Sequence, residues 1–184
     1  MRIVAGAFGG RRLVAPAGDA TRPTTDRVRE ALFSILAGRG VLAGARVLDL
    51  YAGTGALGLE AVSRGAAHAT FVEAGRPALT ALRDNVRALD VGDVTTVAAA
   101  RAEAWVKTAA AASPFDLVLA DPPWADVARA CDAIAVLVGR GLVAEEGLVV
   151  LEHAARDASI SIAGLEVVDE RAWGDTAAWL GHPA

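Results

Sequence analysis

The sequence predicts an α/β fold, a Rossmann-like, doubly wound sheet of seven mostly parallel strands with an N-terminal β-hairpin extension. From Arg46 onward, short continuous apolar runs alternate with alanine-rich stretches of helical periodicity. A glycine-rich turn joins the first run to the first helical stretch, and two last apolar runs flank Trp173-Gly174-Asp175. Continuous apolar strands between helices are typical of a parallel sheet covered on both faces. One domain is expected over residues 1–184.

The N-terminal region predicts a hairpin and then an amphipathic helix. Two β-prone runs, 2–5 and 11–15, flank Phe8-Gly9-Gly10, so residues 1–22 are expected to form a small β-hairpin appendage. The segment 22–26 supplies a proline stop and an aspartate cap. Apolar residues then recur at helical spacing, at Val28, Leu32, Ile35 and Leu36.

The elements of the sheet follow in regular order. The expected strands are 47–50, 70–73, 94–98, 115–120 and 148–152, with helices at 57–64, 77–89, 101–110 and 127–138. The runs 165–172 and 176–180 predict a closing antiparallel hairpin. Ligands of such sheets bind beyond the carboxyl ends of the strands, so residues that follow strands are the site candidates.

The charge is unevenly distributed along the chain. The net charge is −4, but residues 1–39 hold seven arginines against three acidic residues, a local charge of +4 that leaves −8 for the rest. This split predicts a basic region that contacts phosphates and an acidic body that holds a cationic cofactor. Chance clustering of solvated charges is the alternative interpretation.

The composition also limits the class of protein. The one cysteine, Cys131, cannot form an internal disulfide, and no Cys/His cluster has zinc-ligand spacing. No apolar run is long enough to span a bilayer. A soluble cytoplasmic protein without a metal is therefore expected, and a monomer is favoured.

The turn after the first strand of the parallel sheet predicts a cofactor loop. It reads Asp49-Leu-Tyr-Ala-Gly53-Thr-Gly55-Ala-Leu-Gly58, the G-x-G-x-x-G arrangement that lets a backbone approach a ligand closely. Glu73 ends the next strand, 20 residues after Gly53, where it can hold a ribose diol. Nicotinamide cofactors use the same spacing, but the carboxylate of Asp49 opposes a pyrophosphate and attracts the ammonium and sulfonium groups of S-adenosylmethionine. Asp49 as a simple loop cap is the alternative.

The most specific feature is Asp121-Pro122-Pro123-Trp124, at the carboxyl end of the strand 115–120. Two prolines fix φ and lack N–H donors, so the loop can present acceptors rigidly. An exocyclic amine is a poor nucleophile until it is oriented, and we expect the Asp121 side chain and the Pro122 carbonyl to accept its two N–H groups. Trp124 is expected to stack on the base. A proline turn beside a core tryptophan is the alternative interpretation.

Together these loops resemble class I S-adenosylmethionine methyltransferases that act on amino nitrogens. The segment Arg22-Pro-Thr-Thr-Asp-Arg-Val-Arg-Glu30, preceded by Gly10-Arg-Arg12, resembles the signature of the RsmD family, bacterial methyltransferases of guanine N2 in 16S ribosomal RNA. The resemblance covers nearly the whole chain and implies a hairpin that contributes to RNA binding. The substrate-binding residues expected on this basis are Arg11, Arg12, Arg22, Thr24, Thr25, Arg27 and Arg29. The catalytic residues expected are Asp121, Pro122, Pro123 and Trp124.

The resemblance also implies the cofactor contacts. Asp49 and the glycine loop are expected to hold the methionine part, Glu73 the ribose, and the segment Arg101-Ala102-Glu103 the adenine. Related enzymes often carry Asp or Asn near position 101, so Arg101 departs from the pattern, and Glu103 or the Ala102 backbone is expected to substitute. The cofactor residues expected in full are Asp49, Tyr51, Ala52, Gly53, Thr54, Gly55, Gly58, Glu73, Ala74, Arg101, Ala102 and Glu103.

Several functions remain open at this point. Another base or DNA is an alternative substrate, with adenine N6 ahead of cytosine C5, because Cys131 lies on an expected helix and not beside the prolines. A non-catalytic RNA-binding module and an oxidoreductase are rivals from other classes. The sequence leaves the target nucleotide open, as well as the choice between naked RNA and an assembling small ribosomal subunit as substrate.

Overall fold

A computed structural model describes residues 1–16, 26–110, 113–157 and 160–184. The described chain contains a seven-stranded sheet of order β3-β2-β1-β4-β5-β7-β6. Its strands are β1 (Arg46–Leu50), β2 (His68–Glu73), β3 (Thr95–Ala99), β4 (Phe115–Ala120), β5 (Val143–Ala154), β6 (Leu165–Trp173) and β7 (Thr176–Pro183). Its helices are α1 (Asp26–Gly38), α2 (Ala56–Ser63), α3 (Arg76–Leu89), α4 (Ala102–Thr108) and α5 (Val127–Gly139), with short 3₁₀ turns at Gly92–Val94 and Trp124–Asp126.

The predicted α/β sheet is confirmed. Strands β1 to β5 run parallel, β7 pairs antiparallel with β5, and β6 pairs antiparallel with β7 as the predicted closing hairpin. The sequence underestimated β5, which begins five residues before the expected start at Leu148 and ends at Ala154. Its first residues read Val-Ala-Glu-Glu-Gly, a polar run without apolar continuity, and the register with β4 shifts there.

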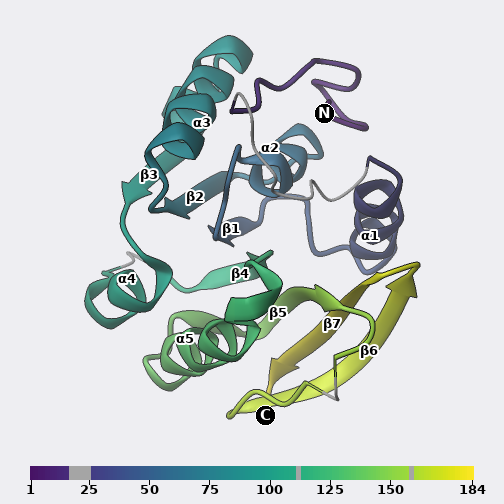
Figure 1. Cartoon of the computed structure of the whole chain (residues 1–184), viewed down its shortest axis with the longest axis vertical. Coiled ribbons are helices and arrows are strands. Elements are labelled where there is room, and N and C mark those ends of the chain that lie inside the picture. The colour runs from purple at the N-terminus through teal and green to yellow at the C-terminus, as the bar shows by residue number, and fades with distance from the viewer. Residues whose placement is uncertain (17–25, 111–112, 158–159) are drawn as a thin grey trace.

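Helices cover both faces of the sheet (Figure 1). One apolar core joins α1, α2 and α3 to one face, and a second joins α4 and α5 to the other. Side chains alternate along a strand, so Val47 of β1 faces the first core whereas Leu48 and Leu50 face the second. Asp49 shares the face of Val47 and therefore points toward α2.

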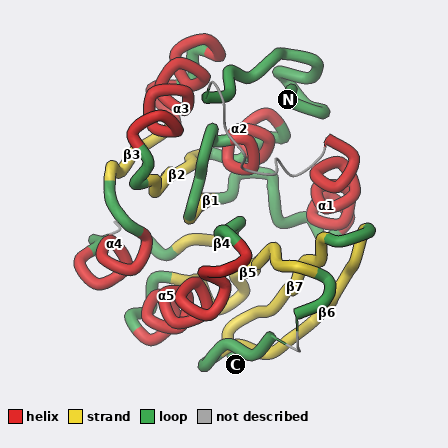
Figure 2. Tube along the Cα trace, viewed as in Figure 1, coloured by secondary structure: helices red, strands yellow, loops and turns green. Residues whose placement is uncertain are grey.

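The N-terminal segment, residues 1–16, lies over α2 and α3 and folds back on itself through a turn at residues 5–10 (Figure 2). It pairs with itself through one antiparallel bridge, Arg2 to Arg12, and through backbone bonds from Ile3 to Arg11 and from Gly10 to Ile3, both 2.9 Å long, but it forms no regular strands. Its backbone donors explain the difference, because the amides of Val4 and Ala5 donate to the Glu60 carboxylate on α2 and not across a ladder. Ile3 and Leu13 are buried in the first core. The segment is thus fastened to the body of the protein.

The predicted closing hairpin is filled by Trp179, which is 1% exposed within the second core. Trp173 is half-buried against the first core, so the two tryptophans of this hairpin pack on opposite cores. Among the helices of the described residues, none is long and apolar enough to cross a membrane.

Candidate active site

The two predicted loops meet at the ends of adjacent strands. β1 and β4 are neighbours in the sheet, with Leu50 opposite Ala120 in register, so the glycine loop after β1 and the Asp121 loop after β4 leave the sheet side by side. The strand order also reverses here: β2 and β3 lie on one side of β1, whereas β4 and β5 lie on the other. Such a switch point is where doubly wound sheets bind ligands.

Asp49 is a buried carboxyl that fastens the loop to α2. It is 1% exposed, and its Oδ2 accepts the backbone N–H of Gly58 at 2.8 Å. Burial raises the pKa of Asp49 to about 8, against the lowering effect of the Gly58 hydrogen bond and with added repulsion from Asp121 and Glu73. The charges of Asp121 and Glu73 therefore reach Asp49 at this end of the sheet, and a nearby cation would favour the ionised form of Asp49.

Glu73 ties the end of β2 to the glycine loop. Its Oε2 accepts the N–H of Gly53 at 2.8 Å, and its Oε1 accepts those of Ala74 at 2.9 Å and Gly75 at 2.6 Å. A carboxylate has about four acceptor positions, so these bonds fill most of them. The side chain is half-buried and held in one orientation by the backbone around it.

The three loop glycines differ in what a side chain would meet. A Cβ at Gly55 would lie 2.4 Å from Leu82 Cδ1, and one at Gly58 would lie 2.4 Å from Phe71 Cε1. At Gly53 only the Tyr51 carbonyl oxygen would lie within reach, at 4.0 Å. Gly55 and Gly58 are therefore required by packing inside the fold, whereas Gly53 borders open space. Packing alone therefore accounts for glycine at positions 55 and 58, and their expected contact with a ligand stays a prediction.

A side-chain bond links the glycine loop to α4. Tyr51, in the left-handed region with φ +59°, donates its hydroxyl to Oε1 of Glu103 at 2.9 Å. Burial and this bond to Glu103 raise the pKa of Tyr51 above its ordinary value. Arg101 is exposed at the start of α4 and Ala102 is buried beneath it. The structure thus places the Arg101 segment opposite the loop, through a contact that the sequence pattern did not indicate.

The Asp-Pro-Pro-Trp loop turns sharply into α5. The Pro123 carbonyl oxygen accepts the N–H of Asp126 at 2.7 Å and opens the 3₁₀ turn that contains Trp124. Asp121 and Trp124 are half-buried, Pro122 is buried and Pro123 is exposed. The guanidinium of Arg156, beyond β5, lies 5.7 Å from the centroid of the Trp124 ring. Sequence reasoning missed Arg156 because nothing in its neighbourhood marks it.

The expected RNA residues fall into three groups. Arg11, Arg12 and Arg27 are exposed, and Arg11 donates to the Ala88 carbonyl oxygen at the end of α3 at 2.7 Å. Arg22, Thr24 and Thr25 lie outside the described residues. Arg29 is 0% exposed, so its assignment as an RNA contact is wrong.

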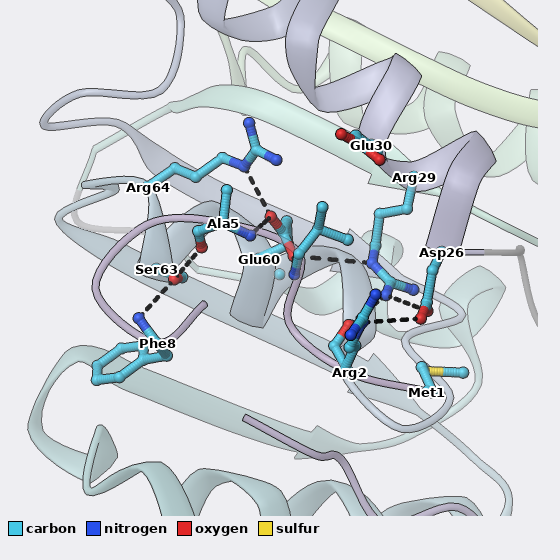
Figure 3. A network of polar contacts seen from close by, with 12 residues as sticks. Met1, Arg2, Ala5, Phe8, Asp26, Arg29, Glu30, Glu60, Ser63 and Arg64 are labelled. Carbon is cyan, nitrogen blue, oxygen red and sulfur yellow. Dashed lines mark hydrogen bonds and ion pairs between the residues drawn. The ribbon is translucent and has the colours of Figure 1, made fainter. Parts of the chain in front are cut away.

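Arg29 has a structural role instead. Its Nη2 donates to Asp26 Oδ1 at 2.8 Å and to the Arg2 carbonyl oxygen, and its Nε lies 3.7 Å from Glu60 Oε2 (Figure 3). Position 29 follows Val28 on the buried side of α1, and a charged residue that is buried needs an internal partner.

Polar residues of α2 that the sequence did not single out hold the first part of the N-terminal segment. Glu60, 0% exposed, accepts the amides of Val4 at 2.6 Å and Ala5 at 3.0 Å, and pairs with Arg64 at 2.7 Å. Ser63 accepts the N–H of Phe8 at 2.9 Å and donates to the Ala5 carbonyl oxygen (Figure 3). A glutamate and a serine at the buried positions of an apolar helix are the signal that could have indicated them.

Two cavities lie elsewhere. One of about 410 Å³ is lined by residues that include Arg39, Glu145 and His182, and one of about 230 Å³ by Arg46, His68 and Trp105 among others. Neither includes a residue of the glycine loop or of the Asp121 loop. In the described ranges, no group of His, Cys, Asp and Glu side chains is arranged to hold a metal ion.

Comparison with known proteins agrees with this geometry. A family model described as "Conserved hypothetical protein 95" matches residues 1–182. Ribosomal RNA small subunit methyltransferase D of Escherichia coli K12 is 40% identical over 152 residues, which are 83% of this chain and 74% of that protein. The chain belongs to the RsmD family.

Solved structures agree with this family assignment. The structure of the Escherichia coli protein YhhF matches with a TM-score of 0.85 and 36% identity, over 100% of this chain and 97% of that one. A protein of Thermus thermophilus matches with a TM-score of 0.81 and 35% identity, over 98% of both chains. The RsmD-family chain therefore has the class I methyltransferase fold.

Proposed function

We propose that this chain transfers a methyl group from S-adenosylmethionine to the exocyclic N2 amine of a guanine in small-subunit ribosomal RNA. The observation that carries the proposal is the convergence of Asp49, Glu73 and Asp121 beside a glycine loop at one switch point. Mutually repelling carboxyls fit a cationic ligand and oppose the pyrophosphate of a nicotinamide cofactor. Membership of the RsmD family supports ribosomal RNA as the substrate, because its Escherichia coli relative carries that substrate in its name.

The residues present fit the cofactor. The charge of Asp49 can act on a bound cation from beneath the loop, and the open side of Gly53 leaves room for a ligand against the backbone. Glu73 is the acid for the ribose, with Tyr51 and Glu103 at the side that would face the adenine. The cofactor supplies an activated methyl group on a sulfonium centre, and the protein supplies orientation and charge.

The chemistry at the amine needs orientation more than acid or base strength. The N2 lone pair of guanine is delocalised into the ring, so acceptors that bind its two N–H groups turn the nitrogen toward the methyl donor. We assign this to the Asp121 carboxylate and the Pro122 carbonyl, with Trp124 stacking on the base. Attack on cytosine C5 through a thiolate is disfavoured, because burial and the charge of Asp132 raise the pKa of Cys131, which lies on α5.

A methyl-transfer assay tests the proposal. The substrate is small ribosomal subunits from cells that lack the protein, with labelled S-adenosylmethionine and nucleoside analysis of the product. We expect labelled N2-methylguanosine from the wild type and at least about a 100-fold lower rate from Asp121→Ala. The matched control is Asp126→Ala, which removes a nearby carboxylate paired with Arg129 and should keep most of the rate. Methylated adenine, or no product from a protein that binds the cofactor, would overturn the assignment.

A further inference from the structure

The N-terminal segment and the glycine loop are joined by one buried side chain. Asn85 of α3 is 1% exposed. Its Oδ1 accepts the N–H of Val14 at 2.7 Å, and its Nδ2 donates to the Val14 carbonyl oxygen at 3.1 Å. The same Nδ2 donates to the Thr54 carbonyl oxygen at 3.0 Å. A single amide therefore holds residue 14 of the segment and the residue between Gly53 and Gly55.

A second contact joins the same two parts. The hydroxyl of Thr54 lies 3.5 Å from the sulfur of Met1. The glycines on both sides of Thr54 have positive φ, +56° and +81°. Residues other than glycine rarely adopt this backbone conformation. If the amide of Asn85 lost one of these acceptors, its N–H donor would stay buried and unsatisfied. That loss costs more free energy than the loss of a solvent-exposed hydrogen bond. The position of Thr54 therefore depends on Val14, and that of Val14 on Thr54.

We propose that Asn85 is a positioning residue that couples cofactor binding at the glycine loop to RNA binding at the N-terminal segment. The inference rests on the proposed function, which places the cofactor at one end of this contact and RNA at the other. A ligand that fixes Thr54 also fixes Val14 through the amide. Because coupling between two sites is reciprocal, RNA raises the affinity for the cofactor by the same factor as the cofactor raises the affinity for RNA.

The test measures the coupling factor and not either affinity alone. The dissociation constant of small subunits from cells lacking the protein is measured with and without saturating S-adenosylhomocysteine, which cannot react. We expect the cofactor product to tighten wild-type binding at least about fivefold. In Asn85→Ala and Asn85→Asp the ratio should fall to about 1, because neither side chain can donate to both carbonyl oxygens. Thr80→Ala, an exposed change on the same helix, should keep the wild-type ratio.

The outcomes separate the coupling from the proposed function. A wild type that binds both ligands with a ratio of 1 overturns the coupling and leaves the proposed function intact, whereas a wild type that binds neither overturns both. An Asn85 variant that folds and keeps the wild-type ratio overturns the role of Asn85. Should neither variant fold, amide hydrogen exchange at Val14 decides in the wild type, since S-adenosylhomocysteine should slow it several-fold. Unchanged exchange at Val14 overturns the inference.

Discussion

The backbone N–H of Gly53 donates a 2.8 Å hydrogen bond to Oε2 of Glu73, which joins the loop after β1 to the end of β2. Glu73 is the acid expected to bind the ribose, and Gly53 is the loop glycine that borders open space. The bond fixes the position of one relative to the other. Below them, Asp49 fixes Gly58 at the same distance. The loop is therefore held at both ends by carboxyl groups, whose ionisation sets the charge that a ligand meets.

The pKa of Asp49 predicts a pH-dependent cofactor affinity. Burial raises it to about 8, so the free protein carries this carboxyl protonated at neutral pH. A cationic ligand favours the ionised form, so binding releases a proton and the affinity rises with pH, by up to about tenfold per pH unit below about pH 8. Titration calorimetry with S-adenosylmethionine between about pH 6 and about pH 7.5 measures this rise.

Asp49→Asn is the matched variant for that titration, because an amide can still accept the Gly58 N–H but never ionises. We expect a weaker affinity that no longer changes across the same pH range. In the wild type, the raised pKa of Asp49 also makes the stability of the fold depend on pH. A carboxyl whose pKa is raised from 3.8 to about 8 favours the folded state at low pH and loses that contribution as the pH rises through this window. A pH slope of the affinity that survives in the Asp49→Asn variant would contradict the role of this carboxyl.

Alanine substitutions should separate the glycines of the loop. Gly55→Ala adds a Cβ 2.4 Å from Leu82 in a backbone with φ +81°, so both overpacking and backbone strain destabilise it, by about 2 to 4 kcal/mol together. Gly10→Ala has φ +82° and nothing within 4 Å, so it measures the strain alone, about 1 kcal/mol. Gly53→Ala should fold and bind the cofactor poorly. Chemical denaturation and calorimetry check the three, and equal stabilities of the Gly10 and Gly55 variants would refute the packing argument.

The fold was largely predictable because its strands are continuous apolar runs whose glycine and proline boundaries are local signals. The loops that carry Asp49 and Asp121 follow those strands, so their proximity followed from the parallel sheet once β1 and β4 were neighbours. The N-terminal segment was not predictable in detail. Its backbone amides donate to Glu60, on a helix 55 or more residues away in the sequence. A β-prone sequence does not indicate which acceptor its amide groups will bind.

Arg29 illustrates the same limit. Its place in a basic, RsmD-like signature indicated RNA, whereas its burial beside Glu60 depends on how α1 and α2 pack. Asn85 could be noted as a buried-face polar residue of an amphipathic helix, but the two carbonyl oxygens that it binds lie 31 and 71 residues away. Contacts of this range depend on tertiary structure, and periodicity carries no information about them.

Arg29→Met should destabilise the protein strongly. It removes a buried cation and leaves the Glu60 carboxylate, also 0% exposed, with less compensation, which costs about 3 to 5 kcal/mol. The melting temperature should fall by about 10 °C. Arg27→Met on the same helix is the control, because Arg27 is exposed and its loss should change the melting temperature by little. Thermal unfolding of both variants measures the difference, and similar melting temperatures would mean that Arg29 is not structural.

The exposed arginines of the N-terminal segment should contact RNA, so their removal should change the salt dependence of RNA binding with little change in the melting temperature. Arg12 is exposed, whereas Arg11 also donates to the Ala88 carbonyl oxygen, so Arg12→Ala is the cleaner variant. Each lost phosphate contact reduces the slope of log affinity against log salt by about 0.7 for single strands. We expect this change in Arg12→Ala with an unaltered melting temperature, since an exposed arginine contributes little to stability.

The comparison that decides the location of the RNA surface uses Arg171→Ala. Arg171 is exposed on the edge strand β6 and pairs with Asp169, in the acidic part of the chain. Its removal should leave the salt slope for small-subunit RNA at the wild-type value. Arg11→Ala should lower both the slope and, slightly, the melting temperature, because it loses a phosphate contact and a bond to α3. If Arg171→Ala lowers the slope while Arg12→Ala keeps it, RNA binds on the side of β6, and the uneven charge of the chain does not indicate its binding surface.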